Sequence, residues 1–230
     1  LTKLKKEDGF SMGLSGLKIP EKTTLACIVN PNNPSGTVLD LKGSTGILDK
    51  YPDTKFLVDE AFIEFAGKPV TRMVKDHDNL FVTRTFSKAF SLAGFRVGYA
   101  VLPEETAEHF NNNNDAYPLC RAGEAAAIAV LDNVDKIMKR VKDLKKWAGQ
   151  LSEELESLCI RTYPTETYFF LAELPSMSAK RFAIELEKKG VQVKTAEQAG
   201  LGPKFVKFTT STPENNEIVI KKVRSILKRG

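Results

Sequence analysis

The first hundred residues alternate between short apolar runs and clusters of turn-forming or charged residues. The apolar runs cover residues 24–29, 55–58, 80–83 and 96–102, and loops or short helical segments separate them. The first run is apolar throughout, which predicts a central strand that is buried on both faces. Because crossover segments separate the runs, we predict an α/β fold with a mostly parallel sheet.

Beyond residue 103 the apolar positions recur with helical spacing. A helix should run from Glu104 to the asparagine run, and residues 121–147 should form one long helix or two in series. The composition shifts here from sheet-forming to amphipathic, so we predict a large domain over residues 1–135 and a smaller α+β domain over residues 136–230. Within the smaller domain we expect helices at 179–189 and after Thr212, and short strands at 168–171, 191–194 and 205–208.

Composition and charge narrow the function classes. The chain has 230 residues, 42% of them hydrophobic, and a formal net charge of +5. The basic residues are scattered, so we predict no nucleic-acid partner, and no apolar run approaches the length of a membrane span. The two histidines lack ligand-like neighbours, so we predict no metal site.

The three cysteines are far apart, and each lies in an apolar setting. We therefore expect buried free thiols in a reducing compartment. With no visible signal peptide, this predicts a cytoplasmic protein.

Polar residues follow three of the predicted strands. In an open α/β sheet, ligands bind at these carboxyl ends of the strands. Asn33 follows the first strand, Asp59 the second, and the segment 85–88 the third, with Arg96 beyond. Singly, each has a simpler explanation: Asn33 shapes an Asn-Pro turn, Asp59 caps a turn, and Lys88 is a solvated loop residue. Together they supply an amide, a carboxylate, hydroxyls, an amine and a guanidinium, a set that suits pyridoxal phosphate. Burial and the neighbouring Arg96 should favour the neutral, reactive amine of Lys88.

Three motifs carry a family resemblance: Asn-Pro-Ser-Gly at 33–36, Asp-Glu-Ala-Phe at 59–62, and Thr-Phe-Ser-Lys at 85–88, with Arg96 eight positions further on. They resemble the class I/II pyridoxal-phosphate-dependent aminotransferases of the aspartate aminotransferase superfamily. Histidinol-phosphate aminotransferase has the closest pattern. The resemblance is strong over residues 24–101 and weaker beyond. It implies the large domain of a fold-type I enzyme as the cofactor-binding domain, and a homodimer.

The resemblance also implies roles for individual residues. Lys88 would bond the cofactor aldehyde and move the proton at the reacting carbon, and Asp59 would pair with the pyridine nitrogen. Asn33 would donate to the phenolic oxygen, and Ala61 would let the ring lie flat. The cofactor phosphate would be held by Thr85, Ser87 and Arg96.

The chain departs from the family pattern at several positions. Phe62 stands where aminotransferases usually have a tyrosine, as in threonine-phosphate decarboxylase. Lys207 stands where the pattern has the arginine that grips the substrate, although it could equally be an exposed strand lysine. Tyr168 replaces an asparagine near the substrate. The N-terminal part of the family pattern is absent from this sequence.

Three functions are therefore open. The first is amino-group transfer between an amino acid or amino-alcohol phosphate, histidinol-phosphate-like, and 2-oxoglutarate, which gives glutamate. The second is a threonine-phosphate-type decarboxylase, favoured by Phe62. The third is a truncated, non-catalytic scaffold, against which the Lys88–Asp59 pair argues.

Overall fold

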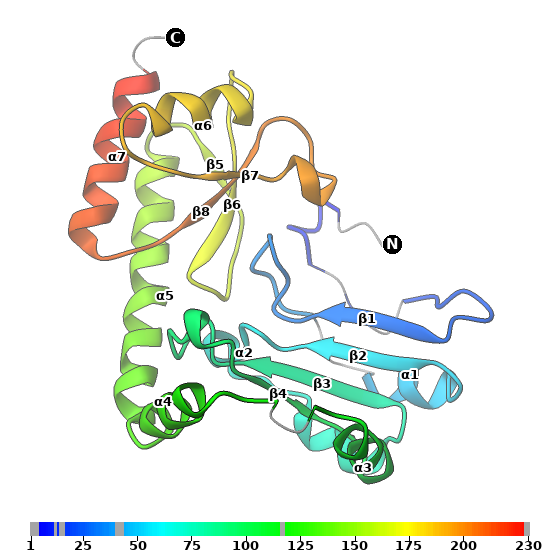
Figure 1. Cartoon of the computed structure of the whole chain (residues 1–230). Helices are drawn as coiled ribbons and strands as arrows, with labels where there is room; N and C mark the ends of the chain where they lie inside the picture. Colours follow the sequence, from blue (N-terminus) through cyan, green and yellow to red (C-terminus); the bar gives the residue numbers. More distant parts are fainter. Residues whose placement is uncertain (1–4, 12, 14–16, 40–43, 116–117, 228–230) are drawn as a thin grey trace. The chain divides into compact units, whose positions relative to one another are not determined.

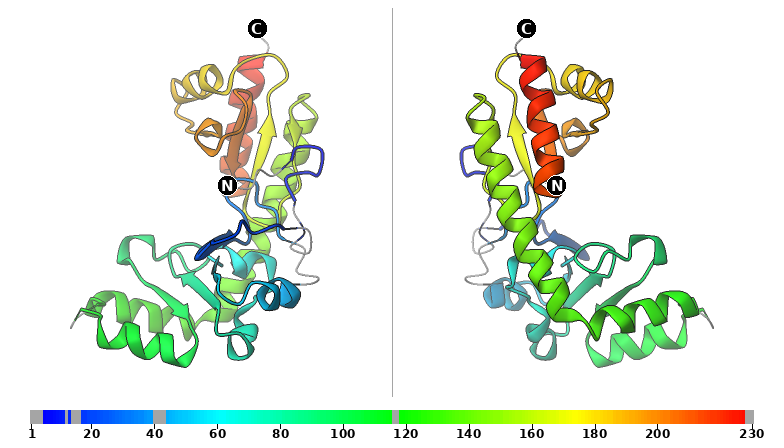
Figure 2. Two further views of the ribbon diagram at one scale, coloured as in Figure 1. Left: turned by 90° about the vertical axis from the view of Figure 1, so that its right-hand side faces the viewer. Right: turned by 90° about the vertical axis from the view of Figure 1, so that its left-hand side faces the viewer.

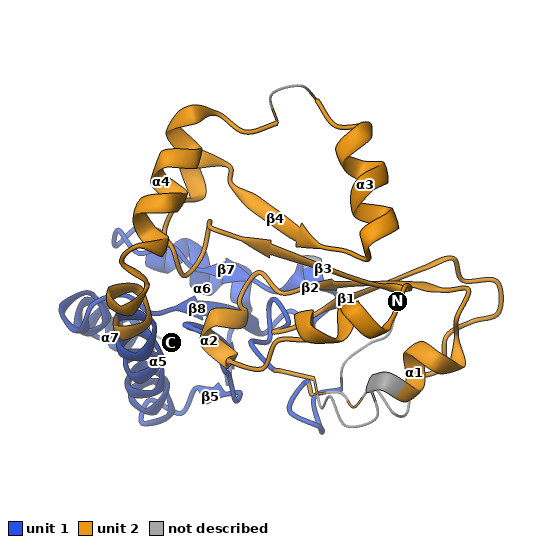
Figure 3. Ribbon diagram, turned by 90° about the horizontal axis from the view of Figure 1, so that it is seen from below, with its two compact units in different colours: residues 1–10, 32–37, 140–230 blue, residues 11–31, 38–139 orange. Residues whose placement is uncertain are grey.

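The computed structural model describes residues 5–11, 13, 17–39, 44–115 and 118–227 (Figure 1). The chain forms two compact units, coloured separately in Figure 3. Unit 1 comprises residues 1–10, 32–37 and 140–230, and unit 2 comprises residues 11–31 and 38–139. The division into a large and a small domain after residue 135 stays a prediction.

Unit 2 is built on a four-stranded sheet in the order β1-β2-β3-β4. Strands β1 (Leu25–Val29), β2 (Lys55–Asp59) and β3 (Leu80–Thr85) are parallel, which confirms the mostly parallel α/β sheet. The fourth strand, β4 (Gly98–Val101), pairs antiparallel with β3. The apolar pattern located this strand but carried no information on its direction, because direction depends on the pairing partner.

Strand β1 lies at an edge of this sheet, so the expected central position is wrong for the described structure. Ile28 is buried in the core, whereas Leu25 is 52% exposed and Cys27 is also exposed. The other two cysteines, Cys120 and Cys159, are exposed as well, so the expectation of buried thiols is wrong. An apolar run shows that a strand can be covered on both faces, not that it is.

One face of the unit 2 sheet packs on a core. Alternate residues of the strands point to this face, among them Phe56 and Val58 of β2 and Leu80 and Val82 of β3. Buried residues of helix α1 (Ser44–Lys50) and of the 3-10 helix η2 (Thr71–Asp76) complete it. The remaining elements of this unit are α2 (Ile63–Ala66), η3 (Ala93–Phe95), α3 (Glu104–Asn112) and α4 (Arg121–Leu131).

Unit 1 has an antiparallel sheet in the order β5-β6-β8-β7. Its strands are β5 (Arg161–Thr162), β6 (Phe169–Glu173), β7 (Lys194–Thr195) and β8 (Phe205–Thr209). Its core joins β6 and β8 to one face each of α5 (Val134–Glu156), α6 (Ala179–Glu187) and α7 (Pro213–Leu227). Figure 2 shows α5 and α7 running along this sheet, and the 3-10 helix η4 (Glu197–Ala199) completes the unit.

The helices of the second half follow the predicted pattern. Residues 121–147 fall into two helices in series, α4 and α5, and α7 starts with Pro213 directly after Thr212. Gly190 follows α6 with a φ of +79°, as a C-terminal glycine should. Among the described residues, no helix is long and apolar enough to cross a membrane, and no cluster of three potential metal ligands occurs.

Candidate active site

The carboxyl ends of β2 and β3 lie side by side in unit 2, since Asp59 pairs with Thr83 in the parallel ladder. Asp59 ends β2 and Thr85 ends β3. Because β4 is antiparallel, it starts where β3 ends, with Gly98 opposite Thr85. Arg96, two residues before β4, therefore reaches the same edge, and the reversed strand direction brings it there.

Asp59 lies on the sheet face opposite the core residues Phe56 and Val58, because side chains alternate along a strand. Its carboxylate is half-buried, and Oδ1 accepts a hydrogen bond from the backbone N–H of Ala61 at 2.9 Å. This contact fixes the carboxylate over the turn that follows β2. A carboxylate held in this way can accept a further hydrogen bond from a cationic ring nitrogen.

The loop after β3 is closed by its own hydrogen bonds. Thr85 Oγ1 accepts the N–H of Ser87 at 3.0 Å and donates to the carbonyl of Val97 at 3.4 Å. The N–H of Ser91 then donates to the carbonyl of Lys88 at 3.0 Å. The hydroxyls of Thr85 and Ser87 and the amine of Lys88 are thereby held within one turn.

Lys88 is exposed, so the expected burial of its amine is wrong for the described structure. Its Nζ lies 5.3 Å from the ring centroid of Phe62, over the turn that also carries Asp59. Phe62 is buried and offers a flat apolar surface without a hydroxyl. The amine and the carboxylate predicted from the sequence therefore border the same turn.

Arg96 is a predicted phosphate ligand with an exposed side chain. Its backbone is left-handed, with a φ of +57°, and its exposed guanidinium donates through Nη1 to the carbonyl of Ala93 at 2.8 Å. That contact occupies one nitrogen and leaves further donors of the guanidinium for an anion.

The other three predicted residues, Asn33, Tyr168 and Lys207, belong to unit 1. Lys207 on β8 donates to Asn33 Oδ1 at 2.8 Å, and its Nζ lies 3.7 Å from the ring centroid of Phe169. Tyr168 directly precedes β6, and burial raises the pKa of its hydroxyl. The predicted site residues are thus divided between the two units.

The Asn33 turn needs the glycine at position 36. Gly36 has a φ of +77°, and a Cβ there would come within 2.9 Å of the carbonyl oxygen of Phe169. Its own N–H donates to the carbonyl of Asn32 at 2.8 Å, and its carbonyl accepts the N–H of Glu166 at 2.8 Å. These contacts hold the turn against the loop before β6 within unit 1 and so fix Asn33 beside Lys207.

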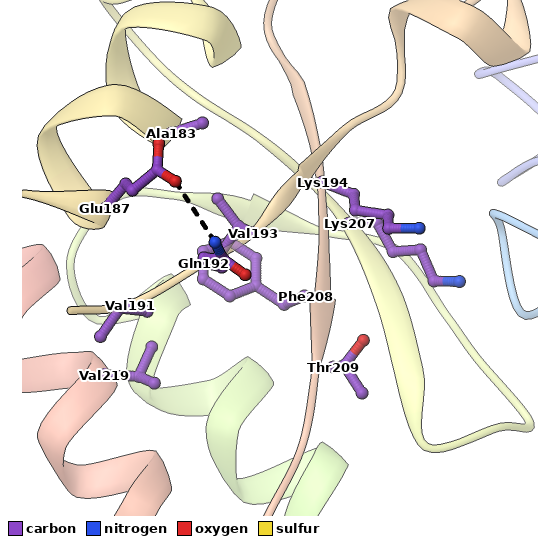
Figure 4. A pocket seen from close by; sticks show the side chains of 10 residues that line it. All are labelled: Ala183, Glu187, Val191, Gln192, Val193, Lys194, Lys207, Phe208, Thr209 and Val219. Atoms are coloured by element: carbon purple, nitrogen blue, oxygen red, sulfur yellow. Dashed lines mark hydrogen bonds between the residues drawn. The ribbon is translucent and has the colours of Figure 1, made fainter. Parts of the chain in front are cut away.

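Lys194 is a candidate that the sequence reasoning missed. It pairs with Lys207 across the β7–β8 ladder, and Figure 4 shows the two amino groups side by side. Both residues border a cavity of about 490 Å³, but their amino groups point away from its other lining residues, such as Glu187 and Gln192 (Figure 4). Two neighbouring cations suit a carboxylate or a phosphate. The spacing of two lysines in separate strands gave no signal, because register decides whether they meet.

Comparison with known proteins identifies the family. Residues 2–223 match the family described as aminotransferase class I and II. The chain belongs to this family. A histidinol-phosphate aminotransferase from Methanococcoides burtonii is 34% identical over 95% of the chain and 60% of the relative. Another from Methanocaldococcus jannaschii is 32% identical over 98% of the chain and 62% of the relative.

Solved structures agree with this class I and II aminotransferase assignment. Histidinol-phosphate aminotransferase from Clostridium acetobutylicum has a TM-score of 0.84 at 25% identity, over 90% of the chain and 64% of that structure. L-threonine-O-3-phosphate decarboxylase from Porphyromonas gingivalis has a TM-score of 0.83 at 23% identity, over 94% and 67% respectively, which shows a shared fold. The chain spans about 60% of the length of the curated relatives it matches.

The family assignment confirms the resemblance seen in the sequence. The cofactor of this family is pyridoxal phosphate, and a histidinol-phosphate aminotransferase from Sinorhizobium meliloti with a similar fold was solved with that cofactor bound. The described residues fit the group, because one sheet edge of unit 2 carries an amine, a carboxylate, two hydroxyls and a guanidinium.

Proposed function

We propose that the protein transfers an amino group between an amino acid or amino-alcohol phosphate and 2-oxoglutarate, with a histidinol-phosphate-like compound as the substrate. The observation that carries this proposal is the placement of Lys88 over the turn that ends in Phe62 and begins at Asp59. The relatives named histidinol-phosphate aminotransferase support the substrate class.

Pyridoxal phosphate, when bound, supplies an aldehyde that bonds amines and a ring that accepts electrons. Asp59 would hold a proton on the ring nitrogen, and Lys88 would move the proton at the substrate's α-carbon. Ala61 would let the ring lie flat. The phosphate of the cofactor would be bound by Thr85, Ser87 and Arg96.

Asn33 would donate to the phenolic oxygen of the cofactor. The contact with Lys207 supports this role, because it uses the amide oxygen of Asn33 and leaves the Nδ2 hydrogens for an acceptor. Lys207 and Lys194 would together bind the anionic end of the substrate, and Tyr168 would border it. Two lysines present two point charges and lack the planar fork of an arginine, so they neutralise an anion without fixing its plane.

The proposal includes the domain organisation, the assembly and the location of the enzyme. Residues 1–135 would form the cofactor-binding domain and residues 136–230 the small domain, in a homodimer as the family resemblance implies. We place the protein in the cytoplasm, where free thiols such as the three exposed cysteines persist.

One observation favours a second function. Phe62 is buried beside Lys88 and lacks the hydroxyl that aminotransferases usually have there. A threonine-phosphate-type decarboxylase is the alternative that this residue supports. A non-catalytic scaffold is the third possibility.

Product analysis separates the three. The whole protein is incubated with pyridoxal phosphate and either histidinol phosphate plus 2-oxoglutarate or threonine phosphate, and Lys88→Ala serves as the control. We expect glutamate to form with the unchanged protein only. Carbon dioxide from threonine phosphate without glutamate would establish the decarboxylase, and the absence of both products would leave the scaffold.

A further inference from the structure

A buried pair of opposite charges lies directly beneath the predicted cofactor edge. Glu60 follows Asp59 and has no exposed surface, and Arg84 precedes Thr85 with its side chain 18% exposed. Alternation along the strands places Glu60 on the core face with Phe56 and Val58. The same alternation places Arg84 there with Val82. Asp59 and Thr85 are their neighbours on the opposite face.

The contacts of this pair join four segments of unit 2. Arg84 donates from Nε and Nη2 to Glu60 Oε2 at 2.9 and 2.8 Å. The other oxygen, Oε1, accepts the backbone N–H of Val70 at 2.6 Å. Arg84 Nη1 lies 3.5 Å from the hydroxyl of Tyr99, its partner residue on β4. Both oxygens of the buried carboxylate are therefore hydrogen-bonded.

Stability alone does not account for such a pair. Desolvation of two charges offsets their attraction, so apolar residues of similar volume would hold the strands together about as well. A two-donor arginine contact adds a defined distance and angle between the strands that carry it. Here Glu60 directly follows β2 and Arg84 lies on β3, and the residue after each, Ala61 or Thr85, belongs to the predicted cofactor site.

We infer that Glu60 and Arg84 are positioning residues, which set the carboxylate of Asp59 against the loop that carries Thr85, Ser87 and Lys88. The pair acts through the backbone: the N–H of Glu60 donates to the carbonyl of Thr83 at 2.9 Å, so the two strand ends are joined by a backbone bond as well as by the side chains. The inference rests on the proposed function, since it concerns the same cofactor edge.

Glu60→Gln is the variant that tests the pair. It keeps the shape of the side chain and an acceptor for Val70, and it removes the charge that Arg84 contacts. Glu64→Gln is the matched control. Glu64 lies four residues on, and its Oε2 is buried with no hydrogen-bond partner in the described part of the chain. Its carboxyl interacts with Arg84 and Glu60 through charge, so this variant removes a nearby charge and keeps the two-donor contact between Arg84 and Glu60. Arg84→Lys keeps the positive charge and loses the two-donor contact.

The first readout needs no cofactor. Hydrogen exchange on the whole protein should show amides of 59–62 and 83–88 exchanging about tenfold faster in Glu60→Gln than in Glu64→Gln, with the α6 and α7 amides of unit 1 unchanged. Equal exchange in the two variants would overturn the inference. This outcome is independent of whether the protein binds pyridoxal phosphate at all.

The second readout separates positioning from a purely structural role. The dissociation constant for pyridoxal phosphate is measured by absorbance well below the unfolding temperature, with the fraction of Lys88 trapped by borohydride. We expect Glu60→Gln to weaken binding about tenfold relative to Glu64→Gln and to lower the trapped fraction, and Arg84→Lys to fall between them. A lower unfolding temperature with unchanged affinity and trapping would make the pair structural only. Failure of the unchanged protein to bind the cofactor would refute the proposed function. The hydrogen-exchange result would then decide by itself whether Glu60 and Arg84 hold the two strand ends in position.

Discussion

Replacing Glu173 by glutamine should destabilise unit 1 in a pH-dependent way. Glu173 ends β6, and its carboxylate accepts hydrogen bonds from Lys6 Nζ at 2.8 Å and from the hydroxyl of Tyr163 at 2.8 Å. Glutamine keeps the shape and a neutral acceptor for Tyr163. A hydrogen bond to a charged group contributes about 1.5–3 kcal/mol and a neutral one about 0.5–1.5 kcal/mol, so that contact loses about 1 kcal/mol.

The contact with Lys6 contributes less, because the side chain of Lys6 is 40% exposed and solvent screens the pair. An exposed ion pair is worth about 0.5 kcal/mol. The free energy of unfolding, measured by urea denaturation at pH 7, should therefore fall by about 1–2 kcal/mol in Glu173→Gln.

The pH dependence follows from the pKa of Glu173. Partial burial acts to raise this pKa, but the hydrogen bonds from Lys6 and Tyr163 outweigh it and hold the pKa below the ordinary value of 4.5. A carboxyl with a lowered pKa in the folded state stabilises the fold above its unfolded pKa, and this contribution disappears as the pH falls through the folded pKa. The difference between the two proteins should be constant from pH 7 to about 4.5 and shrink below that.

Glu185→Gln is the control, since Glu185 makes an exposed ion pair with Lys188 and the substitution changes the charge equally. It should change the stability less than Glu173→Gln at pH 7. A difference for Glu173→Gln that persists undiminished at pH 3, or none at pH 7, would refute the reasoning.

Substitutions at three further positions test the site. Gly98→Ala should lower the free energy of unfolding, measured in urea, by about 1–3 kcal/mol, because the new methyl group would lie 2.9 Å from the carbonyl oxygen of Arg84. An unchanged free energy of unfolding would show that β3 and β4 can move apart without cost. Lys207→Met should lower kcat/KM for histidinol phosphate by about 10- to 100-fold while Lys207→Arg retains most of it, and equal values for all three proteins would remove Lys207 from the substrate site. Phe62→Tyr should raise the ratio of glutamate to carbon dioxide formed, and an unchanged ratio would show that the hydroxyl does not select the reaction.

The strands of unit 2 were predictable because each is a short apolar run with a turn signal at its end. The same runs did not show that β4 is antiparallel or that β1 lies at an edge, since neither strand direction nor neighbours are encoded in a local pattern. Cys27 is exposed because it lies on the face of β1 opposite the core residue Ile28. Burial is a property of what packs on a strand, and the apolar run alone does not supply it.

The sequence likewise predicted some features of the candidate site and not others. The carboxyl ends of parallel strands meet by geometry, so the neighbourhood of Asp59 and Thr85 could be predicted from their positions after two strands. The exposure of Lys88 and the contact between Asn33 and Lys207 could not, because both depend on loop conformation. The facing of Lys194 and Lys207 depends on strand register, which the short polar strand β7 does not specify.

The central claim is that Lys88 is the residue that bonds the cofactor. Its most direct test is borohydride reduction of the protein with pyridoxal phosphate, followed by mass spectrometry of the peptides, for the unchanged protein and for Lys88→Ala. The account predicts a pyridoxyl group on the peptide that contains Lys88, and no such modification at any lysine in Lys88→Ala. A cofactor trapped on another lysine in the unchanged protein, or no trapping at all, would contradict it.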